Sequence, residues 1–171
     1  MTNNYKPIMG GVPISIERLA RGLEALGHEV TIFAPTYKEQ QDMEKEHSME
    51  KGNSMEEQHS TENVFRYATC MKHFIGGIVL PNPFDIRIEK EFRRKAFDII
   101  HVHHPMLIGR TAVHLSRKFH IPLVFTYHTR YEQYASCYTK GICKLDRIMP
   151  LYLRGFLKHC NFVFAPTLGM Q

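Results

Sequence analysis

Three histidines stand close together at the end of an apolar segment, where imidazoles could bind a metal ion or a polar ligand. His101, His103 and His104 lie in and directly after Asp98–Val102 (DIIHV), which the pattern predicts to be a strand. In a strand, residues 101 and 103 share one face whereas 104 points away, and no carboxylate or cysteine stands at a matching spacing. Since zinc sites take three or four protein ligands, we predict no metal site and interpret these residues as a polar strand tip.

His128 is a better candidate for chemistry because it follows a second apolar segment, Ile121–Tyr127 (IPLVFTY). Thr129 and Arg130 come next, so this strand end carries an imidazole, a hydroxyl and a guanidinium. An imidazole there could hydrogen-bond a hydroxyl or, when charged, a phosphate. The alternative is a histidine that caps the segment and binds no ligand.

Gly10 and Gly11 precede a predicted helix that has Pro13 in its first turn. Without Cβ atoms the backbone can approach a phosphate closely, and the helix N-terminus supplies free N–H groups and the positive end of the dipole. The sequence contains neither G-x-G-x-x-G nor G-x-x-x-x-G-K-[ST], so neither a dinucleotide fingerprint nor a P-loop is supported. An anion site and a turn that only needs glycine are equally supported alternatives.

Helical patterns alternate with apolar segments along the chain, and these elements must position the candidates. Helices are predicted over Pro13–Leu26, Asp85–Ala96, Met106–Phe119 and Asp146–His159, and strands over Val30–Ala34, Val64–Thr69, Asp98–Val102, Ile121–Tyr127 and Asn161–Ala165. Strands that are apolar on both faces and separated by helices indicate a parallel sheet covered on both sides. We therefore predict an α/β, doubly wound, mostly parallel Rossmann-like sheet, in which ligands bind at the carboxyl ends of the strands. We further expect Gly10-Gly11, His103-His104 and Tyr127-His128-Thr129 to converge at one edge of this sheet.

A different composition sets residues 38–63 apart from the rest of the 171-residue chain. Three similar hexapeptides follow one another at Met43–Ser48 (MEKEHS), Met49–Ser54 (MEKGNS) and Met55–Ser60 (MEEQHS). Eight acidic and three basic residues give this stretch a balance of −5 within a chain of net charge +5, which leaves +10 for the remainder. So few apolar residues cannot offset the entropy of ordering, and we predict a disordered, low-complexity acidic insertion.

The apolar runs, the cysteines and the net charge of the chain predict its cellular compartment and the type of its partner. No apolar run approaches the roughly 18 residues that span a bilayer, and the N-terminal MTNNYKPIMGG is not a secretory signal. The four cysteines form no C-x-x-C pair and are expected to be reduced. We predict a cytoplasmic protein whose basic body meets an anionic partner.

A basic run in the second predicted helix could face such a partner. Arg93, Arg94 and Lys95 are consecutive, and a cluster of this kind is typical either of a solvated helix face or of a patch that meets an anionic membrane surface. Contact with the inner face of the membrane is the more specific of the two interpretations.

Three stretches together resemble the N-terminal half of group 1 glycosyltransferases of the GT-B fold. They are YKPIMGGVPISIERLARGLEALGHEVTIFAPTY, FDIIHVHHPMLIGRTAVHLSRKFHIPLVFTYHTRYEQY and CNFVFAPT. The similarity covers nearly all of the chain except residues 38–63, and the order and spacing of these motifs are specific. The segment HTRYEQY is most similar to the subgroup that glycosylates diacylglycerol or related membrane lipids.

The resemblance implies a retaining hexosyltransferase with two Rossmann-like domains facing a cleft. The acceptor, a membrane lipid or a polyol, is held chiefly by the N-terminal domain, and the nucleotide-sugar donor, such as UDP-glucose or GDP-mannose, chiefly by the C-terminal one. No cofactor and no metal bound to a D-x-D motif are implied. By position, Gly10 and Gly11 match the glycine loop near the donor diphosphate, and His128 matches a cleft histidine that contacts the transferred sugar. His104 and Thr167 match loop positions facing the acceptor.

This chain departs from the family pattern at both edges. The family's first strand is missing ahead of Tyr5, and the C-terminal domain with its paired donor-binding glutamates is missing as well, so we expect the 171-residue chain alone to be marginally stable and to transfer little or no sugar. A competing hypothesis is a non-enzymatic basic α/β module that binds an anionic membrane surface or nucleic acid. Nucleic-acid binding would need exposed aromatic and basic residues interleaved, whereas the aromatic residues here lie mostly inside predicted strands, so we predict no nucleic-acid partner.

Overall fold

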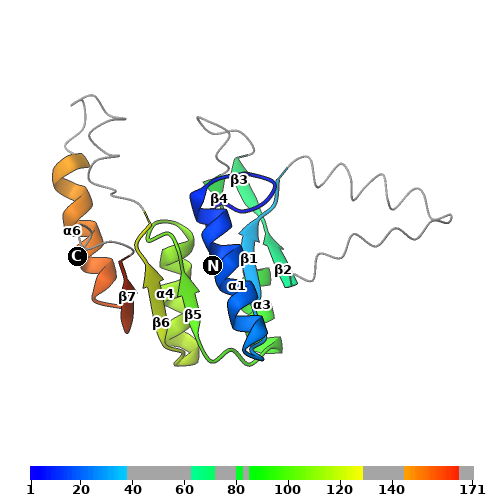
Figure 1. The fold of residues 1–171 in the computed structure, drawn as a ribbon. Coiled ribbons are helices and arrows are strands. Elements are labelled where there is room, and N and C mark those ends of the chain that lie inside the picture. Colours follow the sequence, from blue (N-terminus) through cyan, green and yellow to red (C-terminus); the bar gives the residue numbers. More distant parts are fainter. Residues whose placement is uncertain (38–62, 72–79, 83–84, 129–144, 166–171) are drawn as a thin grey trace, which may run out of the picture. The chain divides into compact units, whose positions relative to one another are not determined.

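The computed structural model describes residues 1–37, 63–71, 80–82, 85–128 and 145–165 (Figure 1). In these residues, parallel strands are flanked by helices. One compact unit lies within Thr2–Asp85, and the other comprises Met1 together with Ile86–Gln171. The predicted α/β class with parallel strands is therefore confirmed, whereas the assignment of residues 1–171 to a single incomplete domain remains a prediction. The predicted insertion lies outside the described residues apart from Asn63, which begins a strand.

The unit Thr2–Asp85 is built on one helix and two parallel strands. The helix α1 (Gly11–Ala25) is followed by β1 (Thr31–Pro35), which pairs in parallel with β2 (Asn63–Tyr67). Its core consists of one face of α1, the inner side of β1 and a residue ahead of the helix: Tyr5, Ile16, Ala20, Ile32 and Ala34. The apolar spacing that predicts this helix and this strand is thus the pattern that buries them together.

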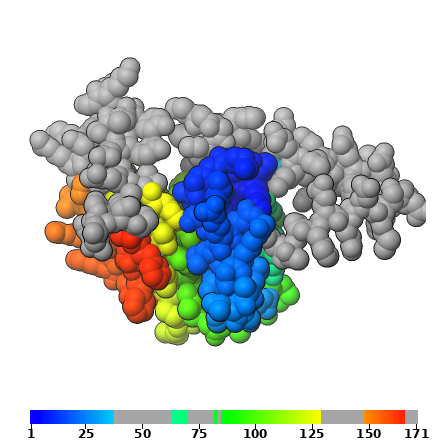
Figure 2. Space-filling model, in the orientation of Figure 1, coloured from blue at the N-terminus to red at the C-terminus, as the bar shows by residue number. Residues whose placement is uncertain are grey.

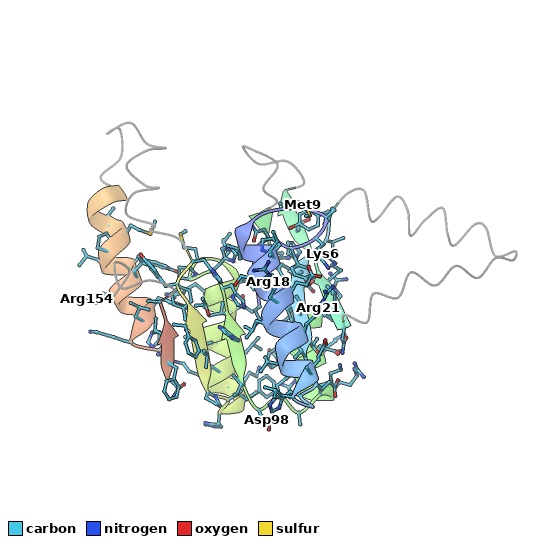
Figure 3. All side chains as sticks on the ribbon, viewed as in Figure 1. Lys6, Met9, Arg18, Arg21, Asp98 and Arg154 are labelled. Atoms are coloured by element: carbon cyan, nitrogen blue, oxygen red, sulfur yellow. The ribbon has the colours of Figure 1, made fainter. Side chains whose placement is uncertain are left out.

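The helix α1 ends where the sequence places a glycine. Gly27 has a φ of +87° and donates its N–H to the carbonyl of Glu24 at 2.9 Å, and His28 donates to Leu23 at 3.1 Å. These two bonds form a Schellman motif, which glycine favours because it lacks a Cβ. The outer face of α1 is charged, and Lys6, labelled in Figure 3, pairs there with Glu17 at 3.2 Å.

The strand predicted over Val64–Thr69 is interrupted in the structure. After β2 the backbone N–H of Ala68 leaves the ladder and donates to the Asp85 carboxylate at 2.6 Å. Two further short strands follow, β3 (Thr69–Met71) and β4 (Leu80–Pro81), and they pair antiparallel with an irregular register. The prediction of one continuous strand was wrong, because a side chain 17 positions away captures the amide that would have continued it.

The second unit is a three-stranded parallel sheet with helices. Its elements in chain order are α3 (Ile86–Arg94), β5 (Ile100–Val102), α4 (Ile108–Phe119), β6 (Leu123–Thr126), α6 (Leu145–Leu157) and β7 (Phe162–Phe164). The strand order is β5-β6-β7, with Val102 opposite Phe125 and Phe125 opposite Val163. Each predicted helix and strand of this region is present, with ends shifted by no more than two residues.

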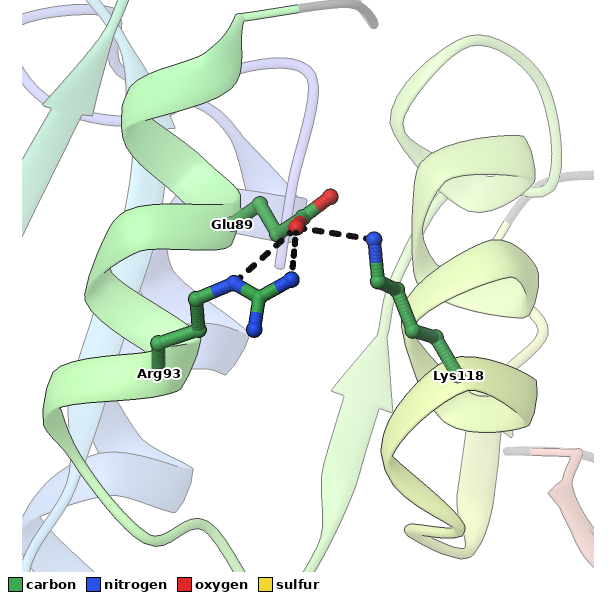
Figure 4. A network of polar contacts seen from close by, with 3 residues as sticks. All are labelled: Glu89, Arg93 and Lys118. Atoms are coloured by element: carbon green, nitrogen blue, oxygen red, sulfur yellow. Dashed lines mark hydrogen bonds and ion pairs between the residues drawn. The ribbon is translucent and has the colours of Figure 1, made fainter.

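The helices α3 and α4 are joined at their surface by a shared carboxylate (Figure 4). Glu89 accepts hydrogen bonds from Arg93 at 2.9 and 3.2 Å and from Lys118 at 2.8 Å. The Lys118 and Arg93 hydrogen bonds hold the pKa of Glu89 below its usual value. Because all three side chains are partly exposed, this network stabilises the unit only modestly.

The last strand is less buried than its sequence suggests. Phe162, Val163 and Phe164 of β7 are exposed over 68%, 44% and 56% of their surface, and the atoms of this segment lie at the surface in Figure 2. An all-apolar strand was expected to be covered on both faces. That expectation was wrong for β7, since the described residues leave all three of its side chains exposed.

The first two residues make strand-like backbone hydrogen bonds although no strand precedes α1. In the second unit, the terminal amine of Met1 donates an N–H to the carbonyl of His101, and the carbonyl of Met1 accepts from the N–H of His103 at 3.1 Å. In the first unit, Thr2 donates its N–H to the carbonyl of Phe33 at 3.0 Å.

Candidate functional site

The carboxyl ends of β5 and β6 bring two of the sequence-predicted histidines into direct contact. The strands are parallel neighbours, so the residues after Val102 and after Thr126 emerge at the same edge of the sheet. There the Nδ1 atom of His103 and the Nε2 atom of His128 form a hydrogen bond of 2.9 Å, and the two ring centroids are 5.1 Å apart. The predicted convergence of these two strand tips is therefore confirmed.

A third imidazole extends the cluster inward along β5. The ring of His101 stacks on the ring of His103 with centroids 4.5 Å apart and an interplanar angle of 19°. Its Nε2 atom lies 2.7 Å from the hydroxyl oxygen of Thr126 on β6. Alternation along the strand places residues 101 and 103 on one face, as the sequence predicted, and the hydrogen bond to Thr126 holds the inner ring in place.

Burial keeps these imidazoles uncharged at neutral pH. It lowers the pKa of His101 from 6.5 to about 4 and that of His104 to about 3, and it lowers the pKa of His103 well below 6.5. Burial also lowers the pKa of His128, which is only half-buried. A neutral imidazole offers one hydrogen-bond donor and one acceptor, so the site is suited to hydroxyl groups rather than to binding phosphate through a charged ring.

The loop after β5 is held tightly from two helices, and this fixes His104. A Cβ atom added to Gly109, the second residue of α4, would lie 2.5 Å from the carbonyl oxygen of His104 and 3.2 Å from the ring of Phe156 on α6. Tyr152, also on α6, donates its hydroxyl hydrogen to the carbonyl of Pro105 at 2.9 Å. Only glycine permits this approach, so the backbone at the site is built with little freedom to relax.

Gly10 and Gly11 lie in the other unit, at the start of α1. Gly10 has φ 174° and ψ 172°, an extended backbone that any residue can adopt. As the N-cap residue of α1 it has no side chain that could make a capping hydrogen bond. A Cβ atom would meet nothing closer than 3.8 Å at Gly10 and nothing within 4 Å at Gly11. The described residues therefore give no steric reason for either glycine, and the anion-site interpretation and the turn interpretation both stay open. Their convergence with the histidines remains a prediction.

The basic run is partly neutralised by its own helix. Arg93 is paired with Glu89, and Arg94 is paired with Glu91 at 2.6 Å, so that each guanidinium has a carboxylate of α3 itself as its partner. Lys95 directly follows the helix. These pairs reduce the net positive charge that α3 can present, and the assignment of this run to a membrane surface remains a prediction.

Three predicted site residues, Thr129, Arg130 and Thr167, lie outside the described residues. Within the part of the chain that the structure describes, no three His, Cys, Asp or Glu side chains group as metal ligands. In the same part, none of the helices combines the length and apolarity needed to traverse a bilayer.

Sequence reasoning did not assign a role to two residues that shape the site. His103 was interpreted only as part of a polar strand tip, although its pairing with His128 could have been suspected from the parallel order of β5 and β6. Gly109 carries no sequence signal beyond being a glycine inside a predicted helix, and only the approach of His104 reveals its function.

Parallel strands with flanking helices define an α/β fold of the Rossmann-like type. Comparison with known families gives the class more closely. The profile of Glycosyltransferase Family 4 matches residues 9–171, and the chain belongs to this family. The resemblance to group 1 glycosyltransferases of the GT-B fold is thereby confirmed.

Two relatives carry the same name, alpha-monoglucosyldiacylglycerol synthase. The chain is 25% identical to the one from Acholeplasma laidlawii over 168 residues, which is 95% of this chain and 38% of that protein. It is 28% identical to the one from Streptococcus pneumoniae (strain ATCC BAA-255 / R6) over 166 residues, 97% of this chain and 34% of that protein. The chain thus spans a little over one third of the length of these relatives. No solved structure matches.

Proposed function

We propose that this chain forms the acceptor-binding half of a retaining glycosyltransferase that moves a hexose from a nucleotide-sugar to a membrane lipid. The observation that carries the proposal is the cluster of neutral imidazoles at the carboxyl edge of a parallel sheet, within a chain of Glycosyltransferase Family 4. The names of the two relatives favour a diacylglycerol-type lipid over a polyol as the acceptor. We further propose that the protein acts at the inner face of the membrane as a peripheral protein.

The chemistry assigned to this half is orientation and charge stabilisation. His128 would hydrogen-bond hydroxyl groups of the transferred hexose and thereby position it for attack, a contribution that comes from geometry and needs no covalent intermediate. When the bond between the sugar and the diphosphate breaks, negative charge develops on the leaving phosphate. The backbone N–H groups following Gly10 and Gly11 would stabilise that charge, since the space beside both glycines admits a close ligand.

The donor site is proposed to lie chiefly outside this chain. Since the chain spans a little over one third of its relatives, we propose that a second domain supplies most contacts to the nucleotide-sugar. On this proposal the 171-residue chain alone transfers no hexose, and a transfer assay that detects glucosyl-lipid formation by the isolated chain contradicts it.

Activity is tested in a chimera in which this chain replaces the aligned part of the S. pneumoniae synthase. Radiolabelled UDP-glucose is supplied with vesicles of phosphatidylglycerol and diacylglycerol, and lipid-soluble label is counted. We expect transfer by the chimera, loss of at least tenfold with His128→Ala, and no change with His114→Ala, an exposed histidine on α4. A chimera that is folded and binds UDP-glucose but labels no lipid contradicts the proposal.

The competing binding-module hypothesis is tested with the 171-residue chain itself. Co-sedimentation with anionic vesicles that weakens as salt rises, together with no binding to single-stranded oligonucleotides, supports the lipid-linked enzyme. Oligonucleotide binding at physiological salt supports the alternative and counts against the proposal.

A further inference from the structure

The contact between His103 and His128 joins two histidines of different burial. His103 is 4% exposed, and its position is held by three contacts: its backbone N–H donates to the carbonyl of Met1, its ring stacks on His101, and its Nδ1 atom meets Nε2 of His128. His128 is half-buried and stands beyond the end of β6. One ring is therefore anchored, and the other can be oriented by it.

A hydrogen bond between two neutral imidazoles requires one ring nitrogen to donate and the other to accept. Nε2–H is the tautomer that a neutral imidazole side chain prefers in water, and a single arrangement gives both rings this form. In that arrangement Nε2–H of His128 donates to the bare Nδ1 of His103. The remaining nitrogen of His128, Nδ1, then carries a lone pair and can only accept.

We propose that His103 is a positioning residue that holds the His128 ring and fixes its tautomer, so that His128 Nδ1 accepts a hydrogen bond from a hydroxyl group of the ligand. The assignment deepens the proposed function and rests on it for the identity of that ligand. It also gives the site a selectivity: an uncharged ring that can only accept binds alcohol hydroxyls and offers nothing to a phosphate oxygen, which is itself an acceptor. The hydroxyl belongs either to the sugar or to the glycerol of the lipid.

The positioning step is tested on the 171-residue chain without ligand. Long-range ¹H–¹⁵N correlation spectra distinguish protonated from bare ring nitrogens, and we expect His128 in the parent chain to be protonated at Nε2 and bare at Nδ1. His103→Leu removes the acceptor, and His128 should then exchange between both tautomers. His103→Asn places an amide atom near the position of Nδ1 and should restore the parent spectrum, whereas His103→Gln places it near Nε2 and should resemble His103→Leu.

Titration with three different compounds identifies which molecule supplies the hydroxyl. Dihexanoylglycerol offers a glycerol hydroxyl, methyl α-glucoside offers sugar hydroxyls, and pyrophosphate offers none. We expect one of the two alcohols to shift the His128 ring resonances, to bind roughly fivefold more weakly to His103→Leu, as loss of one hydrogen bond predicts, and to recover with His103→Asn. Pyrophosphate should leave the His128 resonances unchanged.

Two failures are distinguishable. If the ligand-free His128 spectrum is the same in His103→Leu, or shows Nδ1–H in the parent, or if His103→Asn and His103→Gln behave alike, the positioning proposal is overturned. Should His103→Leu not fold by its amide spectrum, the Asn and Gln pair decides. If the ligand-free spectra behave as expected but neither alcohol binds while pyrophosphate does, the positioning stands and the proposed function fails.

Discussion

Acidification to about pH 5 should destabilise this protein through its buried histidines. In the folded chain the pKa of His101 is lowered to about 4 and that of His104 to about 3, against 6.5 for an exposed imidazole. Below about pH 6.5 these two imidazoles are therefore protonated in the unfolded chain but stay uncharged in the folded chain. A depressed pKa of this kind contributes stability that is fully present above the unfolded value and is lost as the pH falls towards the folded value.

The size of the effect follows from the lowered pKa values of His101 and His104. At about pH 5 each of the two groups has been protonated in the unfolded chain over about 1.5 pH units, which corresponds to about 2 kcal/mol per group. Both together give an upper limit of about 4 kcal/mol, a large part of the 5 to 15 kcal/mol that is typical of a folded protein. His103 and His128 act in the same direction, as does the terminal amine of Met1, whose pKa burial lowers from 8.0 to about 5. Glu89 and Glu91 stay ionised in this range, because hydrogen bonds from Lys118 and Arg94 hold their pKa values below 4.5.

The assay is urea denaturation followed by circular dichroism at about pH 7.5 and about pH 5. We expect the free energy of unfolding to fall by at least about 2 kcal/mol between them, and the loss in the double variant His101→Gln, His104→Gln to be smaller than that of the parent chain by about 2 to 4 kcal/mol. His114→Gln, the exposed control on α4, should retain it. Equal stability of the parent chain at both pH values, or an undiminished loss in the double variant, refutes the reasoning.

Three further outcomes are expected from single sites. Gly109→Ala should lower the free energy of unfolding by about 2 kcal/mol or more, because its Cβ would lie 2.5 Å from the carbonyl oxygen of His104; thermal unfolding checks this against Gly22→Ala, which sits in open space on α1 and should gain up to about 1 kcal/mol. Tyr67→Phe deletes the buried hydroxyl that donates to the Thr2 carbonyl at 2.6 Å, and an unchanged urea midpoint would argue against the expected loss of about 1 to 2 kcal/mol. Burial raises the pKa of Cys160 to about 11, so its alkylation by iodoacetamide near pH 8 should be about a thousandfold slower than that of a fully ionised thiol, as peptide mass mapping would measure; rapid labelling of the folded chain would contradict this.

The elements that could be predicted from the sequence are those whose signal is local. The α1 helix carries its apolar spacing, an early proline and the glycine that terminates it within one stretch of chain. The break at Ala68 carries no such signal, because it depends on Asp85, which is distant in sequence and captures a single amide. The exposure of β7 likewise cannot be predicted from its own composition, which is that of a buried strand.

The same distinction applies to the site. Parallel strand order predicts that the residues after β5 and β6 share an edge, so the proximity of His103 and His128 follows from the alternating pattern. Which nitrogen atoms meet depends on the orientation of both rings, and this is set by the stack with His101 and by the backbone bond from His103 to Met1. These contacts are made across the sheet and leave no trace in sequence spacing.

The acid sensitivity and the proposed ligand preference have one physical origin. Apolar side chains at the positions of His101, His103 and His104 could fill the same volume without binding protons on unfolding, and they would make the protein more stable at low pH. Packing alone therefore does not account for imidazoles at these positions, whereas the uncharged state that burial imposes on them does. Burial holds them uncharged, and an uncharged imidazole anchored by its neighbour presents one directed acceptor at the carboxyl edge of the sheet. The environment that weakens the fold in acid is thus the environment that would direct His128 towards a hydroxyl, as a sugar-transferring site requires.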